Sequence, residues 1–150
     1  MVLDAVLAYF HFVAIFMLFA YLVAESMIIK RPLDAVAIRR IGKIDLIYGA
    51  MAVAVLITGF LRLVYGAKGP DFYLNSWPIY VKIGLFLGVA VISVIPTLAF
   101  VRWRRYLDHE PAWKVPAAEQ LRMRRLITIE LALAGMIPVF AVIMSRGLGH

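Results

Sequence analysis

Residues 3–29 read LDAVLAYFHFVAIFMLFAYLVAESMII, and this stretch decides the fold. It is apolar apart from Asp4, His11, Glu25 and Ser26, and it exceeds the roughly 20 residues that a helix needs to cross the hydrocarbon core of a bilayer. No basic residue precedes it, and no small-residue cleavage site follows a short apolar core, as a secretory signal would require. We therefore interpret it as a first membrane span.

Three further apolar segments have the length of a span, at about residues 44–65, 77–101 and 126–144. Because backbone groups in lipid must be hydrogen-bonded within the protein, all four spans are expected to be helices. Of the 150 residues 64% are hydrophobic, and four spans with their connections use most of that length, which leaves no room for a soluble catalytic domain. The sequence predicts one all-α domain over residues 1–150, an integral membrane four-helix bundle.

The chain contains no cysteine. This excludes disulfide frameworks, thiolate nucleophiles, cysteine-ligated zinc, iron–sulfur clusters and covalent attachment of c-type haem. Any chemistry must come from the few polar side chains or from a bound cofactor.

The net charge of +7 comes from basic residues that gather in two connections. The middle connection has only Lys68, and the carboxyl end only Arg146. The positive-inside rule then predicts cytoplasmic basic connections and two periplasmic termini in a bacterial inner membrane. Topology explains the basic charge, so we expect no nucleic-acid partner. The first connection contains Lys30, Arg31, Arg39, Arg40 and Lys43, and the third Arg102, Arg104, Arg105, Lys114, Arg122, Arg124 and Arg125.

Local signals predict how the helices begin and end near these connections. Asp34 is placed to cap a short basic helix over residues 35–43. Glu119 in the first turn after Pro116 favours a helix start there, so that the fourth span begins inside the cytoplasm. Trp103 is expected at the inner interface, as in an aromatic belt.

An inner layer of acidic residues is predicted from depth along the spans. At 1.5 Å per residue, Glu25, Asp45 and Glu130 lie within about 6 Å of the cytoplasmic ends of their spans. An ionisable residue in a span costs about 2.5 to 3.5 kcal/mol and therefore needs a partner, an escape to the interface or a function. We expect these three carboxylates to pair with arginines of the connections and to fasten the bundle.

An outer layer of cationic residues is harder to explain by structure alone. His11 lies roughly 12 Å, Lys82 roughly 8 Å and Arg62 roughly 5 Å below the outer ends of their spans. Only carboxylates nearer the surface accompany them, so an anionic ligand is one interpretation. The alternatives are that Arg62 and Lys82 extend outward along their helices and that His11 is a hydrogen-bonded core residue.

A b-type haem is the anionic ligand that these residue types fit best. A neutral imidazole on an inward face of a membrane bundle can be an axial ligand to iron, and Arg62 and Lys82 suit the two propionates. Ligation by two histidines is excluded because His109 lies in a cytoplasmic connection and His150 is the last residue. His11 is the predicted ligand, and Lys82 is a candidate second ligand if its amine is desolvated and uncharged.

Several residues follow a known pattern: Tyr9-Phe10-His11-Phe12, Thr58-Gly59, Arg62, and Trp77 followed by Lys82. In this pattern the chain resembles an uncharacterised bacterial family of four-span proteins. That family is distantly similar to the HemJ-type protoporphyrinogen oxidases and to CopD-like membrane domains. The resemblance implies haem b held at the matching positions His11 and Lys82. The HemJ-type proteins oxidise protoporphyrinogen IX, but their Thr-Pro-Gly signature is replaced here by Tyr48-Gly49-Ala50-Met51. The substrate therefore stays open.

Two functions from different classes remain. The first is a haem-binding membrane oxidoreductase that acts on a porphyrinogen or a quinol. The second is a non-catalytic accessory subunit that packs against a larger membrane complex, or against further copies of itself, through faces of small residues. Membrane lipids are expected partners in both.

Overall fold

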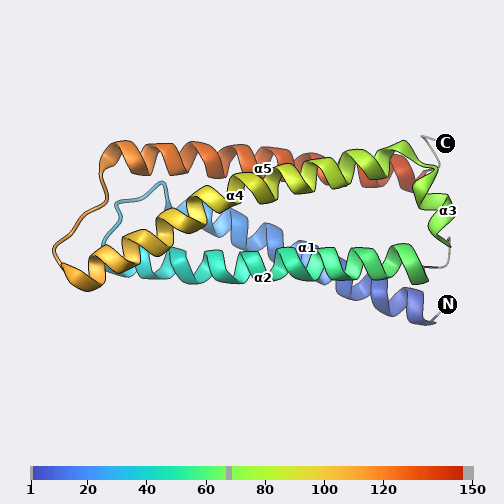
Figure 1. The fold of residues 1–150 in the computed structure, drawn as a ribbon, viewed down its shortest axis with the longest axis horizontal. Helices are drawn as coiled ribbons and strands as arrows, with labels where there is room; N and C mark the ends of the chain where they lie inside the picture. The colour runs from blue at the N-terminus through green and yellow to red at the C-terminus, as the bar shows by residue number, and fades with distance from the viewer. Residues whose placement is uncertain (1, 67–68, 147–150) are drawn as a thin grey trace.

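Four long helices make up most of the computed structural model, which describes residues 2–66 and 69–146 (Figure 1). They are α1 (Val2–Ile28), α2 (Ala35–Tyr65), α4 (Trp77–His109) and α5 (Ala117–Ser145), and a short helix, α3 (Gly69–Leu74), joins α2 to α4. Each of the four is long and apolar enough to cross a membrane. The predicted all-α membrane bundle is confirmed. Lys68 and His150 lie outside the described residues.

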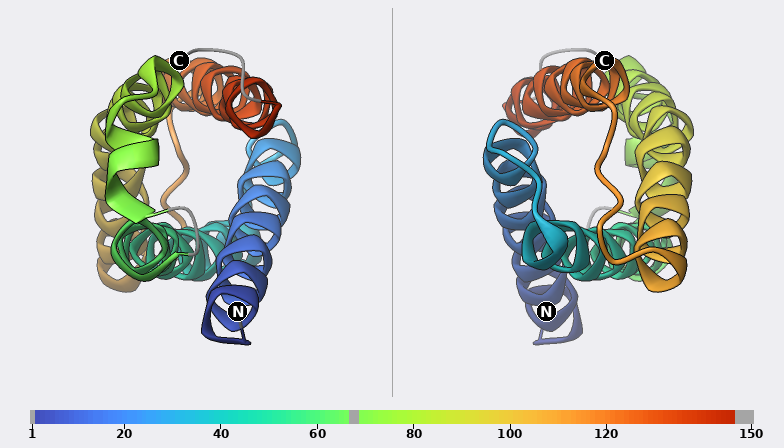
Figure 2. Two further views of the ribbon diagram at one scale, coloured as in Figure 1. Left: turned by 90° about the vertical axis from the view of Figure 1, so that its right-hand side faces the viewer. Right: turned by 90° about the vertical axis from the view of Figure 1, so that its left-hand side faces the viewer.

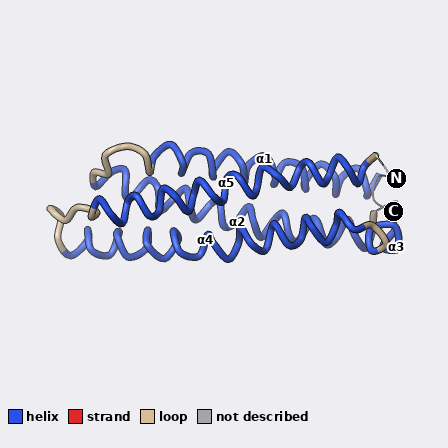
Figure 3. The backbone as a smooth tube through the Cα atoms, turned by 90° about the horizontal axis from the view of Figure 1, so that it is seen from above, coloured by secondary structure: helices blue, strands red, loops and turns tan. Residues whose placement is uncertain are grey.

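The helices run alternately up and down. The connections at residues 29–34 and 110–116 lie at one end of the bundle, here termed the loop end (Figures 1 and 3). Helix α3, Val2 and Ser145 lie at the opposite end, the α3 end. Seen along its length, the bundle is a ring in the order α1, α2, α4, α5 (Figure 2), and the closest pairs are α1 with α2 and α4 with α5. The first turn of α1 and the last turn of α5 therefore lie at the same end of the bundle. That this end faces the periplasm remains a prediction.

Three helices extend beyond the apolar segments that the sequence marked out. Helix α2 begins at Ala35 instead of residue 44, α4 continues to His109 instead of residue 101, and α5 begins at Ala117 instead of residue 126. The added stretches are basic but contain no proline, so nothing ends the helix where the apolar run ends. The predicted cap is confirmed, because the Asp34 carboxylate accepts a hydrogen bond from the Ala37 amide at 2.7 Å. The start of α5 directly after Pro116 is confirmed as well.

The hydrophobic core occupies the half of the bundle nearer the loop end. It draws on all four long helices, and its largest members are Trp103 and Phe100, both fully buried and in edge-to-face contact with ring centroids 5.4 Å apart. Trp103 is therefore part of the core and does not face the lipid as a residue of an aromatic belt would. Helix α4 continues past the apolar segment and turns this indole toward the other helices. The core consists of Leu18, Leu22, Ile29, Ile38, Ile41, Tyr48, Val89, Ala99, Phe100, Trp103, Leu107, Met123, Ile127 and Ala134.

The half nearer the α3 end contains few buried side chains. Within the described residues, α2 has none after Tyr48 and α5 has none after Ala134. Figure 1 shows the α1–α2 pair and the α4–α5 pair diverging toward this end. One ring contact here lies within the α4–α5 pair, where Trp77 of α4 meets Phe140 of α5 with centroids 6.1 Å apart. The α1–α2 pair and the α4–α5 pair therefore pack against each other mainly in the loop half. The predicted outer layer of His11, Arg62 and Lys82 lies in the other, less tightly packed half.

Candidate functional site

His11 of α1 faces α2 in the α3 half of the bundle. Its Nδ1 lies 2.9 Å from the Thr58 hydroxyl oxygen, and that oxygen lies 2.6 Å from the Ala54 carbonyl oxygen one turn earlier in α2. The threonine hydroxyl has a single hydrogen, which it donates to its own helix. Nδ1–H of His11 is then the donor to Thr58. In the neutral imidazole this leaves Nε2 with a free lone pair, the form in which histidine binds iron.

Gly59 lets the imidazole approach the α2 backbone. A Cβ atom at this position would lie 3.2 Å from Cε1 of His11 and 3.8 Å from its Nδ1. The first distance is too short for an unstrained contact, so any larger residue here must move the ring. From the sequence, Thr58-Gly59 were linked to this site only through the family resemblance. Their spacing from Arg62, four and three residues on the same helix, is the signal that assigns all three to one face.

We expect Gly59→Ala to displace the His11 ring by a few tenths of an ångström and to lengthen its bond to Thr58. The ring nitrogen resonances of ¹⁵N-labelled His11 should shift, because a weaker hydrogen bond changes the shielding of Nδ1. Gly49→Ala is the matched control on the same helix, since nothing lies within 4 Å of its added Cβ. Unchanged His11 resonances in Gly59→Ala would contradict this packing.

Arg62 lies one turn beyond Thr58 on α2. Its guanidinium carbon is 5.5 Å from the centre of the Phe12 ring, within the range of a cation–π contact. Its Nε is buried and has no acceptor among the described residues. The side chain is half-buried and turned back against α1, so the alternative in which Arg62 extends freely outward does not describe it.

Lys82 of α4 completes the predicted set. Its ammonium group and the Arg62 guanidinium are both within electrostatic range of the His11 imidazole and of each other. Neither cation takes part in the ion pairs found in the described part of the chain. The structure thus places His11, Arg62 and Lys82, from three helices, within electrostatic range of one another. Two like charges at one depth in a membrane repel each other unless an anion lies between them.

A bare metal ion would find too few ligands at this site. Within the described residues no three His, Asp or Glu side chains are placed to hold one. A macrocycle that brings its own four nitrogen ligands needs only one or two side chains from the protein. The residues present therefore fit a haem better than a free metal ion.

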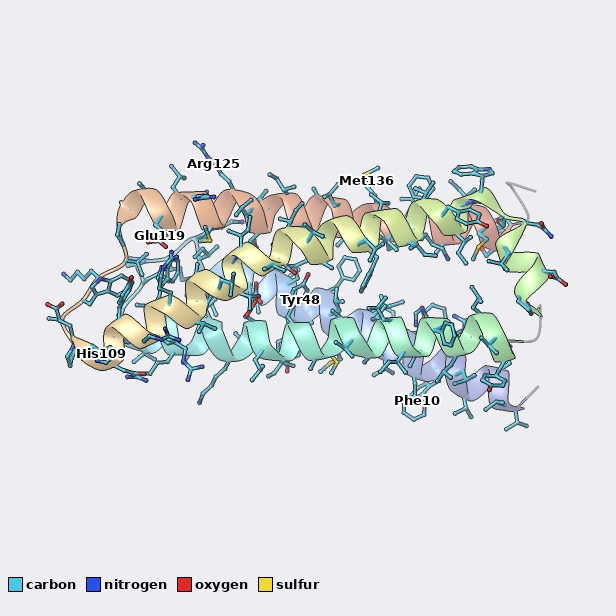
Figure 4. All side chains as sticks on the ribbon, viewed as in Figure 1. Phe10, Tyr48, His109, Glu119, Arg125 and Met136 are labelled. Carbon is cyan, nitrogen blue, oxygen red and sulfur yellow. The ribbon has the colours of Figure 1, made fainter. Side chains whose placement is uncertain are left out.

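The inner acidic residues gather in the loop half of the bundle, away from the arginines expected to pair with them. Glu25 and Glu130 are each 1% exposed and Asp45 is 6% exposed. The three carboxyl groups interact electrostatically. Asp45 accepts a hydrogen bond from the Thr97 hydroxyl at 2.9 Å, and Glu130 accepts a long one from the Tyr48 hydroxyl at 3.4 Å. Figure 4 shows Tyr48 between the helices, whereas Phe10, Arg125 and Met136 point away from them.

The expected pairing of Glu25, Asp45 and Glu130 with loop arginines is wrong. The described arginines that form ion pairs do so with other partners: Arg39 with Asp108 at 2.8 Å, and Arg102 with Glu119. The reason is the direction in which the side chains face. The three carboxyl groups are buried between the helices, whereas Arg40, Arg122 and Arg125 are exposed on the outer faces of theirs.

Thr97→Val is expected to lower the free energy of unfolding by about 1 to 3 kcal/mol, because it leaves the buried Asp45 carboxyl without its hydroxyl donor. Thr97→Ser keeps the hydroxyl and should cost less than the valine variant. Reversible unfolding in mixed detergent micelles compares the two. Equal stability of Thr97→Val and the parent protein would show that the bond contributes nothing.

The fold and these two polar clusters define a class: a small polytopic membrane protein of four spanning helices with ionisable groups inside the bundle. The chain belongs to the family described as predicted membrane protein DUF2214, whose model matches residues 3–149. A search of curated proteins and a search of solved structures found no match.

Proposed function

We propose that this protein binds a b-type haem, or a similar anionic macrocycle, in the α3 half of the bundle. His11 is the axial ligand through Nε2, and Arg62 holds a propionate. Lys82 is either the second ligand or the partner of the other propionate. The observation that supports the proposal is one imidazole within electrostatic range of two cations from two other helices, neither of which forms an ion pair among the described residues, in the half of the bundle that has few buried side chains.

The proposed chemistry is electron transfer in a bacterial inner membrane, with both termini on the periplasmic side. The haem would supply the redox step, and the protein would bind, orient and tune it. A porphyrinogen or a quinol is the proposed reductant, in line with the resemblance to HemJ-type oxidases. The His11–Thr58 bond supports this role, because a fixed imidazole keeps its orientation relative to a bound macrocycle.

Loss of the Soret absorption band in His11→Ala is the expected result that tests the proposal. The parent protein and the variant are purified in detergent from haem-replete bacteria, and the spectra are normalised to protein. His109→Ala is the matched control, because this exposed histidine lies at the loop end (Figure 4). A colourless parent protein, or equal Soret bands in parent and His11→Ala, would overturn haem ligation by His11.

A separate observation supports the alternative function as an accessory subunit. Gly84 of α4 and Gly135 of α5 are exposed and have nothing within 4 Å of an added Cβ, so another helix could approach closely there. Substitution of both by leucine should break such an assembly, which size-exclusion chromatography with light scattering would detect as a smaller particle. This function and haem binding are separable, because the glycines lie outside the cationic site.

A further inference from the structure

A groove of about 380 Å³ lies at the loop end, between the last turns of α1 and the first turns of α2. Its volume falls within the roughly 300 to 1,000 Å³ of small-molecule sites. Arg31, Pro32 and Asp34 of the connection at residues 29–34 line it as well. The groove is far from His11, which lies in the other half of the bundle.

One wall of the groove is apolar. Ala24, Met27 and Ile28 of α1 form this wall, and Val36 in the first turn of α2 adds to it. Met27 is 55% exposed and Val36 is 62% exposed, so no other part of the described chain covers them. Side chains of this kind at a membrane surface contact acyl chains.

The lining of the groove is also basic. Arg31 of the connection and Arg40, one turn beyond Val36 on α2, both line it and are exposed. Neither takes part in an ion pair among the described residues. One carboxylate, Asp34, lines the groove as well and caps α2 through the Ala37 amide, so the two arginines leave a net positive charge. Positive charge beside an apolar wall matches a molecule with an anionic head and an apolar tail.

We propose that this groove binds one anionic phospholipid. The phosphate lies between Arg31 and Arg40, and the first part of an acyl chain runs along the apolar wall of Ala24 and Met27. Guanidinium groups suit phosphate because they donate two parallel hydrogen bonds. A basic pocket between helix ends at the membrane surface is a recognised setting for anionic lipid head groups.

The test uses the full chain in dodecyl maltoside micelles, titrated with phosphatidylglycerol or phosphatidylcholine. Native mass spectrometry counts the lipids that stay bound. The parent protein should retain one phosphatidylglycerol in preference to phosphatidylcholine. Each arginine contributes about fivefold to affinity, so Arg31→Gln with Arg40→Gln should weaken binding of phosphatidylglycerol by about 25-fold. Arg31→Lys with Arg40→Lys should retain most of the affinity, because the positive charges remain.

The matched control is Arg105→Gln with Arg125→Gln, which removes the same charge from exposed positions outside the groove. This control should bind phosphatidylglycerol like the parent protein. An equal loss in both glutamine double variants would mean diffuse surface attraction and would overturn the proposal, as would unchanged binding in the groove variant. Competition by inorganic phosphate alone would overturn the part assigned to the acyl chain. Thermal unfolding of each variant confirms that the protein tested is folded.

Discussion

Fe(III) protoporphyrin IX is expected to bind the Arg62→Gln, Lys82→Gln double variant at least a hundredfold more weakly than the parent protein. A hydrogen bond to a charged group contributes about 1.5 to 3 kcal/mol, and each 1.4 kcal/mol is a factor of ten. The two cations face the same imidazole and are free of carboxylate partners in the described chain, so both are available to propionates. Absorbance titration of the apoprotein measures the affinity.

The dimethyl ester of the same haem is the matched ligand, since it keeps the iron and the ring but has no carboxylates. Its affinity should be nearly equal for the parent protein and for Arg62→Gln. A tenfold loss of ester binding in Lys82→Gln alone would assign Lys82 to the iron instead of a propionate. If the double variant binds the free-acid haem as tightly as the parent, the two cations are not the anion partners.

Phe100→Ala should lower the free energy of unfolding by about 3 kcal/mol, and Phe60→Ala by less than about 1 kcal/mol. Both are phenylalanines in spanning helices, but Phe100 is fully buried in the loop half, whereas Phe60 is 66% exposed in the α3 half. Truncation of the buried ring leaves a cavity between packed helices. The lower end of the usual range applies, because a spanning helix in lipid gains packing but little from excluding water.

Reversible unfolding of the apoprotein in mixed micelles compares these two variants. The pair tests whether stability is concentrated where Trp103 and Phe100 lie. Equal losses would mean that the α3 half packs as tightly as the loop half, and the argument for a large occupant there would be lost.

The sequence was sufficient to predict the four helices, because apolar runs of spanning length leave the backbone no other structure in lipid. It also predicted the shared depth of His11, Arg62 and Lys82, since rise per residue converts position into depth. Thr58 as the partner of His11 was not predicted, because the rotation of one helix against another depends on close contacts such as the one at Gly59.

The acidic residues show what depth arithmetic leaves out. Depth places Glu25, Asp45 and Glu130 beside the basic connections, but it does not say which face of its helix each side chain occupies. All three carboxyl groups turn into the bundle, whereas the arginines expected to pair with them are exposed. Helix α3 was missed for a different reason: its six residues begin with Gly69-Pro70, which is typical of a turn, and are too few to show a helical period.

Paramagnetic relaxation from ferric haem to a nitroxide is the most direct measurement of where the macrocycle lies. The chain has no cysteine, so Tyr65→Cys at the α3 end and Tyr106→Cys at the loop end each give a single labelling site on an exposed residue. With one equivalent of haem bound, the nitroxide at position 65 should relax much faster than the one at position 106, because the effect falls steeply with distance. Faster relaxation at position 106, or no difference between the two, would contradict a haem site at His11.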